Sequence, residues 1–159
     1  MSGLTISILI PAFNCAEKLP DCIRSIHDQT ARPFEIIVID DGSTDETADI
    51  AEKIEGVLLV RRAEQGGAGA ARASGVRAAR GDVVVFIDSD CTAPPDWLEK
   101  ITAKFIENPD SGHLSGTRSQ RNLLPKNDSP LEGARYCLVR SSLLFRCLRD
   151  ARSSLLFII

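Results

Sequence analysis

The sequence predicts an α/β protein with a doubly wound, mostly parallel sheet. Over the first two thirds of the chain, short apolar segments rich in β-branched residues alternate with segments of helical periodicity. A cluster of unusual polar residues follows several of the apolar segments, and no apolar run approaches the roughly 18 residues of a membrane span. Alternation of this kind gives right-handed β-α-β units whose strands lie parallel in one sheet.

The first strand is predicted over Leu4–Ile10 and ends at Pro11. A helix led by Pro20 follows, because proline is well accommodated in the first turn of a helix. Its buried face consists of apolar residues at helical spacing, namely Leu19, Cys22, Ile23 and Ile26. The second strand is predicted over Phe34–Asp40, a nearly continuous apolar run typical of strands that are buried on both faces of a parallel sheet.

A turn and a second helix are predicted after Asp40. Gly42 permits a tight turn, and Ser43 together with Glu46 matches a capping box at the start of the helix. The buried face of this helix is formed by Ala48, Ile50, Ala51 and Ile54. A short third strand over Val57–Val60 follows it.

The segment from about Gly69 to Ala79 is predicted as a helix rich in glycine and alanine, with Gly81 as its C-cap. Its small side chains favour close packing of this helix on the sheet. The fourth strand is predicted over Val83–Ile87. A last helix begins near Pro94, and its apolar face is formed by Trp97, Leu98, Ile101, Phe105 and Ile106.

Three polar clusters lie where predicted strands end: Pro11-Ala12-Phe13-Asn14, Asp40-Asp41-Gly42-Ser43 and Asp88-Ser89-Asp90. In doubly wound sheets, ligands bind beyond the carboxyl ends of the strands. The carboxyl ends of parallel strands share one edge of the sheet. We therefore expect the three clusters to converge on one crevice.

Asp88 and Asp90 point to the same side if the backbone stays extended, and no basic residue adjacent in sequence neutralises them. A hard divalent cation, Mg²⁺ or Mn²⁺, would resolve their repulsion and would share its ligand shell with substrate phosphates. Residues 1–112 contain 11 Lys and Arg against 19 Asp and Glu, a balance of −8 that disfavours a diphosphate unless a metal intervenes. The alternative interpretation of the pair is a solvated turn.

Two further residues are candidates for binding a nucleotide. Helix capping explains the polar residues after Asp41 but not the two adjacent aspartates, Asp40 and Asp41. An aspartate at the end of a strand can accept a hydrogen bond from a base or a ribose, so we assign Asp41 to nucleotide binding. Arg72 lies one or two turns into a helix and can reach a base carbonyl or a phosphate, with an ordinary surface arginine as the alternative. A nicotinamide-dependent oxidoreductase is disfavoured, because Arg72 occupies the third glycine position of the dinucleotide fingerprint and the motif is not in the first β-α turn.

Four segments, "SILIPAFN", "EIIVIDDGSTDET", "QGGAGAARASG" and "GDVVVFIDSDCTAPPDWL", together resemble the amino-terminal half of a family 2 glycosyltransferase with the GT-A fold. The resemblance runs from Leu4 to Asp110. It implies a Rossmann-like nucleotide-binding half that is incomplete at the carboxyl terminus of this chain. It also implies a nucleotide-sugar donor of the UDP or GDP type and a role in cell envelope or polysaccharide biosynthesis.

The resemblance assigns roles to individual residues. Pro11, Ala12 and Phe13 would line the nucleoside pocket, and Asp41 would contact the base with Arg72 nearby. Asp88 and Asp90 would hold Mg²⁺ or Mn²⁺ on the donor's diphosphate.

Family members transfer the sugar with inversion and use a carboxylate on the acceptor side as general base. That base is not identifiable here, because the acids beyond Asp110 have no recognisable context; they are Asp128, Glu132 and Asp150. The acceptor is unknown. The alternative function is a catalytically silent nucleotide-sugar-binding fragment that lacks the base.

A domain boundary is predicted near Gly112. Residues 113–159 contain 8 Lys and Arg against three acids, in contrast to the acidic front section. We interpret this basic tail as a truncated or diverged acceptor section; a surface that contacts anionic lipid and an aberrant reading frame are the alternatives. The five scattered cysteines and the absence of a signal-peptide pattern predict a cytoplasmic protein, with the membrane's cytoplasmic face as the place of any lipid contact. No nucleic-acid partner is predicted.

Overall fold

The computed structural model describes residues 4–107, 136–139 and 155–158. Strands and helices alternate strictly from β1 to α4, and two further strands follow. The elements are β1 (Ile6–Ala12), α1 (Leu19–His27), β2 (Glu35–Asp40), α2 (Thr47–Lys53), β3 (Val57–Arg61), α3 (Gly67–Ala78), β4 (Val83–Ile87), α4 (Trp97–Glu107), β5 (Tyr136–Val139) and β6 (Leu155–Ile158).

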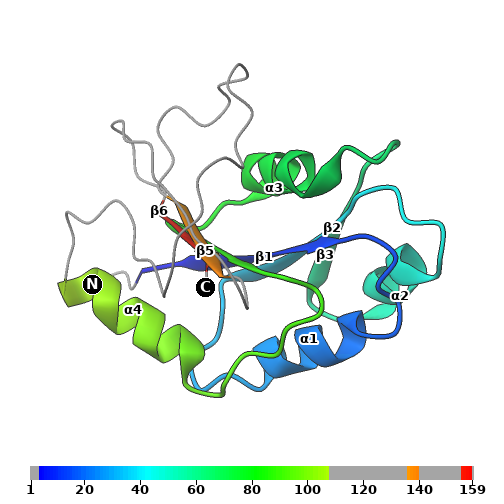
Figure 1. Cartoon of the computed structure of the whole chain (residues 1–159). Coiled ribbons are helices and arrows are strands. Elements are labelled where there is room, and N and C mark those ends of the chain that lie inside the picture. The colour runs from blue at the N-terminus through cyan, green and yellow to red at the C-terminus, as the bar shows by residue number, and fades with distance from the viewer. Residues whose placement is uncertain (1–3, 108–135, 140–154, 159) are drawn as a thin grey trace.

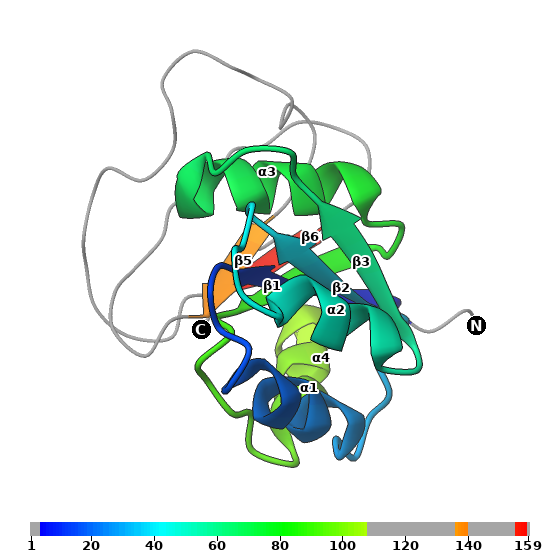
Figure 2. The same cartoon turned by 90° about the vertical axis from the view of Figure 1, so that its right-hand side faces the viewer.

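The described strands form one sheet in the order β3-β2-β1-β4-β5-β6, and every pairing is parallel. Helix α3 covers one face of the sheet, whereas α1, α2 and α4 lie on the other (Figure 1). The view turned by 90° shows the same two layers of helices (Figure 2). The predicted doubly wound α/β fold is therefore confirmed. The strand order reverses between β1 and β4, and this reversal is the point where such sheets bind ligands.

The sheet is buried on both faces at its centre. Residues of β1, β2 and β4 are almost all inaccessible, and Ile8 of β1 lies opposite Ile36 of β2 and Val85 of β4. Complete burial of one such branched side chain contributes about 1.5–3 kcal/mol. The continuous apolar runs that predicted these strands thus correspond to a core with helices on both sides.

Helix α3 lies close to the sheet because Gly75 faces β1 and β2. A Cβ atom added at Gly75 would lie 2.6 Å from a methyl carbon of Leu9 and 2.7 Å from one of Ile39. The prediction that small residues bring this helix close to the sheet is confirmed.

Glycine 81 does not cap α3, contrary to the sequence prediction. The helix ends at Ala78, and the extended backbone of Ala79 turns the chain away. Gly81 is instead buried beside the start of β1, where its amide donates to the Ser7 hydroxyl at 2.9 Å and an added Cβ would lie 2.6 Å from that oxygen. The glycine is needed for close approach of two strands and has no role at the helix end.

Two other local predictions are wrong. Helix α2 begins at Thr47 and Glu46 makes no capping hydrogen bond, so the capping box with Ser43 does not form. Ile106 is 70% exposed, because it lies one step around α4 from the buried Phe105. The tight turn at Gly42 is confirmed by its positive φ of 74°.

Asp82 and Thr5 join the amino ends of β4 and β1. The Thr5 hydroxyl and amide donate to one Asp82 carboxylate oxygen at 2.6 and 3.0 Å, and the Asp82 amide donates back to the Thr5 hydroxyl. The hydrogen bonds from Thr5 lower the pKa of the Asp82 carboxyl below its usual value. This contact favours the register in which β1 and β4 pair.

Replacing Gly75 with alanine is expected to destabilise the protein by about 1–3 kcal/mol, because the new methyl group overpacks the contact with Leu9 and Ile39. Elsewhere in a helix the same change stabilises by about 0.5–1 kcal/mol. Chemical denaturation of both proteins measures the difference, and a more stable variant would contradict the packing described here.

Replacing Asp82 with asparagine is expected to cost about 0.5–1.5 kcal/mol at neutral pH. Because the folded-state pKa of Asp82 is lowered, its contribution is present above the unfolded pKa of about 4 and is lost as the pH falls through the folded value. Denaturation curves between neutral pH and about pH 3 should therefore show the two proteins converging below pH 4. A constant difference over this range would argue against an ionised Asp82.

Candidate functional site

The loops that follow β1 and β2 are joined by hydrogen bonds through Asn14. The backbone amide of Asn14 donates to the Ser43 hydroxyl at 3.0 Å, and its side-chain oxygen accepts from the Thr44 backbone amide at 2.9 Å. Asn14 has a positive φ of 46°, a conformation that asparagine tolerates better than most residues. Asn14, after β1, thus binds Ser43 and Thr44 in the loop after β2.

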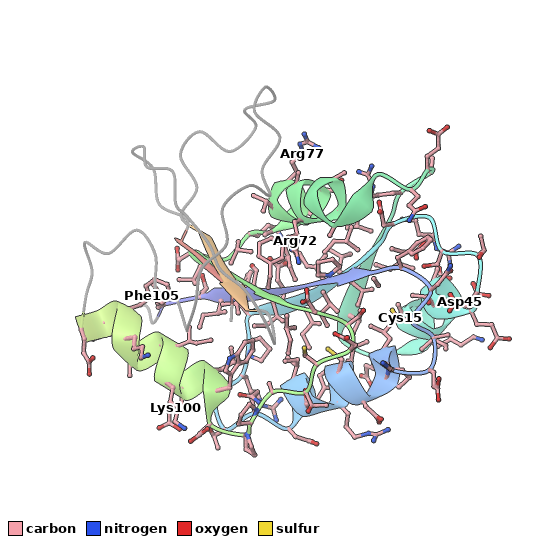
Figure 3. All side chains as sticks on the ribbon, in the orientation of Figure 1. Cys15, Asp45, Arg72, Arg77, Lys100 and Phe105 are labelled. Carbon is pink, nitrogen blue, oxygen red and sulfur yellow. The ribbon has the colours of Figure 1, made fainter. Side chains whose placement is uncertain are left out.

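Two more contacts continue this link. The Ala16 amide donates to Asp45 at 3.1 Å, and the Cys15 amide donates to the hydroxyl of the buried Thr47 at 2.8 Å. Figure 3 shows Cys15 and Asp45 together at this end of the sheet. Partial desolvation acts to raise the pKa of Asp45, but the hydrogen bonds from Thr47 and Ala16 outweigh it and lower that pKa. Hydrogen bonds therefore hold the loops after β1 and β2 together.

Asp41 lies at the end of β2, and its side chain is only 4% exposed. One oxygen accepts from Arg62 Nε at 2.6 Å, and the other accepts from the Gly67 amide at 2.7 Å. The Gly66 amide donates to both oxygens at 3.1 and 3.2 Å. Asp41 thus connects β2 to the start of α3.

Arg72 and Asp88 form an ion pair between α3 and the end of β4. The distance between Arg72 Nη2 and Asp88 Oδ1 is 3.0 Å, and their side chains are 17% and 22% exposed. Figure 3 shows Arg72 directed from α3 toward the sheet, whereas Arg77 of the same helix points away from it. The sequence prediction left Arg72 open between a ligand contact and a surface residue; the structure places it at the strand end beside Asp88.

Asp90 follows Asp88 by two residues and is exposed to solvent. The Cys91 amide donates to the Asp88 carbonyl at 2.9 Å, so the chain turns here and does not stay extended as the sequence argument assumed. The Cys91 thiol lies 3.6 Å from an Asp90 oxygen. Within the described residues no cluster of three or more His, Cys, Asp or Glu side chains is arranged to hold a metal ion.

Cys22 of α1 lies beneath this turn. Its thiol donates to the Asp88 carbonyl at 3.6 Å. Burial, with smaller contributions from Cys91, Cys15 and the two aspartates, raises the pKa of Cys22 to about 12. Cys22 is therefore a neutral thiol at physiological pH and packs beneath the turn that follows β4.

The first cluster lies at the carboxyl end of β1. Pro11 is partly buried, Ala12 is buried, and Phe13 exposes 41% of its surface. Pro11 and Ala12 still pair with β2, so Phe13 is the first residue of this cluster whose side chain stands out from the sheet. The three clusters thus lie at one edge of the sheet.

Sequence reasoning missed Arg62, which lies directly after β3 and reaches Asp41. The sequence contained a signal for this residue. Adjacent residues of an extended chain point to opposite faces, so one of the two arginines at the end of β3 is expected to face the site. Asp128, Glu132 and Asp150 lie outside the described residues. Of the tail at residues 113–159, only β5 and β6 are described, and they belong to the sheet. No helix among the described elements is long and apolar enough to span a membrane.

The model of glycosyl transferase family 2 matches residues 7–143. The chain belongs to this family. Among its relatives is the glycosyltransferase AglE of Haloferax volcanii, which is 33% identical over 101 residues that make up 60% of this chain and 33% of AglE. The chain therefore spans about a third of the length of this relative.

Two proteins of known structure share the fold. S. aureus TarS 1–349 has a TM-score of 0.63 at 25% identity, over 75% of this chain and 39% of that chain. Glucosyl-3-phosphoglycerate synthase from Mycobacterium tuberculosis, solved with Mn²⁺, UDP and glucosyl-3-phosphoglycerate, has a TM-score of 0.60 at 31% identity, over 74% of this chain and 45% of that chain. These likenesses confirm the predicted GT-A fold.

Replacing Asn14 with alanine is expected to cost about 1–3 kcal/mol, because the variant loses the acceptor for Thr44 and strains a backbone with positive φ. Replacing it with glycine removes the same acceptor without the strain, so that loss should be smaller. Urea denaturation of the two variants compares them directly. Equal losses would show that the backbone conformation of Asn14 carries no cost.

Proposed function

We propose that the chain forms the donor-binding part of a glycosyltransferase that uses a nucleotide-diphospho-sugar of the UDP or GDP type. The observation that carries this proposal is the position of Asp88 and Asp90 at the reversal of strand order, with Arg72 beside them. The fold is shared with an enzyme that was solved with Mn²⁺ and UDP. The transfer itself, and inversion at the sugar carbon, are proposed for the whole protein.

The proposed metal ligands are Asp88 and Asp90. Carboxylate oxygens suit Mg²⁺ and Mn²⁺, and such ions are commonly held by one or two carboxylates together with substrate phosphates. The absence of a third protein ligand among the described residues fits this arrangement. A bound cation would act as a Lewis acid toward the leaving nucleoside diphosphate.

Arg72 is proposed to complement the donor's diphosphate. It already compensates the charge of Asp88, in a part of the chain where acids outnumber bases. A guanidinium offers several donors in a fixed plane, so it can bind a phosphate oxygen while it stays beside the carboxylate. The guanidinium of Arg72 on α3 would then stabilise the negative charge that develops on the leaving group.

Pro11, Ala12, Phe13 and Asp41 are proposed to hold the nucleoside. A carboxylate accepts up to about four hydrogen bonds, and Asp41 accepts four from three groups in this structure. A base with a ring N–H, such as uracil or guanine, would bind by replacing one of the two longer contacts from the Gly66 amide, at 3.1 and 3.2 Å. Phe13, exposed at the end of β1, offers an apolar surface to the same nucleoside.

A catalytically silent nucleotide-sugar-binding fragment is the second candidate, because no general base has been assigned in this chain. Turnover with UDP-sugars and GDP-sugars separates the two functions. Sugar transfer or slow donor hydrolysis supports the enzyme, and metal-dependent nucleotide binding with neither reaction supports the silent fragment. Binding of NAD without binding of UDP or GDP would contradict both.

Replacing Asp90 with alanine is expected to abolish Mn²⁺-dependent binding of UDP or GDP and to leave the melting temperature nearly unchanged, since Asp90 is exposed. Calorimetric titration with and without EDTA measures the binding. Asp49→Ala is the control, because Asp49 is an exposed acid on α2 that pairs with Arg61. If Asp90→Ala binds nucleotide as the unmodified chain does, the pair does not hold the metal.

A further inference from the structure

Two adjacent arginines at the end of β3 have different surroundings. Arg61 points outward, and its half-exposed guanidinium pairs with Asp49 and Glu52 on α2. Arg62 turns inward, and its side chain is 25% exposed. The two residues have the same chemistry, so their contacts alone distinguish their roles.

Arg62 joins the end of β2 to the first two turns of α3. Its Nε donates to Asp41 at 2.6 Å, and its Nη1 donates to the Ser74 hydroxyl at 2.8 Å and the Ala70 carbonyl at 3.4 Å. Its backbone amide donates to the Asp40 carbonyl at 2.9 Å, which fixes the start of the side chain. One guanidinium therefore contacts both elements that meet at this corner of the sheet.

The chain before α3 is shaped around this guanidinium. A Cβ atom at Gly66 would lie 2.5 Å from Arg62 Nη2, so a residue with a side chain would displace the arginine. The amides of Gly66 and Gly67 donate to the same Asp41 that Arg62 contacts. Arg62, Asp41 and the glycine pair thus form one network that seats the start of α3.

The same helix carries the contact to the proposed metal pair. Arg72 lies between Ala70 and Ser74, the two residues that Arg62 contacts, and it reaches Asp88 at the end of β4. Helix α3 also packs against Leu9 and Ile39 at Gly75, so Arg72 keeps this support when Arg62 is changed.

We propose that Arg62 is a positioning residue of the nucleotide site: it holds Asp41 and the Gly66–Gly67 segment in the positions where they receive the donor's nucleoside. This inference rests on the proposed donor-binding function and deepens it, because it assigns a part in nucleoside binding to a residue outside the motifs. An arginine is required, since its planar fork donates in several directions at once, whereas a lysine supplies a point charge.

The test compares the purified 159-residue chain with Arg62→Lys, which keeps a charge beside Asp41 and loses the fork. Calorimetry with Mn²⁺ measures binding of UDP, GDP and inorganic pyrophosphate. The unmodified chain should bind one nucleotide at least about tenfold more tightly than pyrophosphate. In Arg62→Lys this ratio should fall by about tenfold, the effect of losing about 1.4 kcal/mol, while pyrophosphate binding changes less than about twofold.

Two further variants guard the interpretation. Arg61→Lys is the matched control and should keep the ratio of the unmodified chain. Ser74→Ala removes one contact of Arg62 and leaves its pair with Asp41, so it should show a smaller loss in the same direction. Thermal melting of each variant identifies losses that come from unfolding.

The outcomes separate the inference from the function on which it rests. An unchanged ratio in a folded Arg62→Lys protein would overturn the positioning role and leave the donor-binding function standing. An equal loss of nucleotide and pyrophosphate affinity would also overturn it, because a merely structural residue would act on both ligands alike. An unmodified chain that binds no nucleotide more tightly than pyrophosphate would overturn the proposed function together with this inference.

Discussion

Two aspartate–arginine pairs connect the carboxyl ends of β2 and β4 to α3, and the arrangement of the site depends on them. Asp41 pairs with Arg62, and Asp88 pairs with Arg72. A buried or half-buried carboxylate is costly unless a charge or a set of donors compensates it. In each pair the arginine compensates the charge of the aspartate and also holds α3 over the ends of the strands. The buried residues Ala71 and Gly75 add apolar contact between α3 and the sheet.

This electrostatic arrangement explains why an acidic front section can form a compact site. The acids at the strand ends receive hydrogen bonds from backbone amides and guanidinium groups, as Asp41 does from Gly66 and Gly67. Other acids lie on the outer faces of helices, where water screens them. Asp90, which lies beyond the end of β4, is among the acids that are exposed to water.

The sequence predicted the strands well because central strands of a parallel sheet need apolar residues on both faces, and Val83–Ile87 and Ile36–Ile39 show this directly. It predicted the convergence of polar residues for the same topological reason. It did not predict their partners. Ser43 matched a capping box, but its hydroxyl binds Asn14 of another loop. Gly81 matched a helix cap, but a glycine is needed there because Ser7 of β1, which is distant in sequence, leaves no room for a side chain. Such pairings depend on the distance between loops, which local patterns do not contain.

Asp88 is assigned two partners, Arg72 in the structure and a divalent cation in the proposed function, and the charges determine how they coexist. A cation at Asp88 and Asp90 weakens the attraction between Asp88 and Arg72, since two positive groups then share one carboxylate. A diphosphate relieves this competition because it carries enough negative charge to bind both the cation and the guanidinium. Cation and nucleotide should therefore bind cooperatively, each raising the affinity for the other. In the proposed function, the pairing of Arg72 with Asp88 would therefore favour the complete metal–nucleotide complex over either component alone.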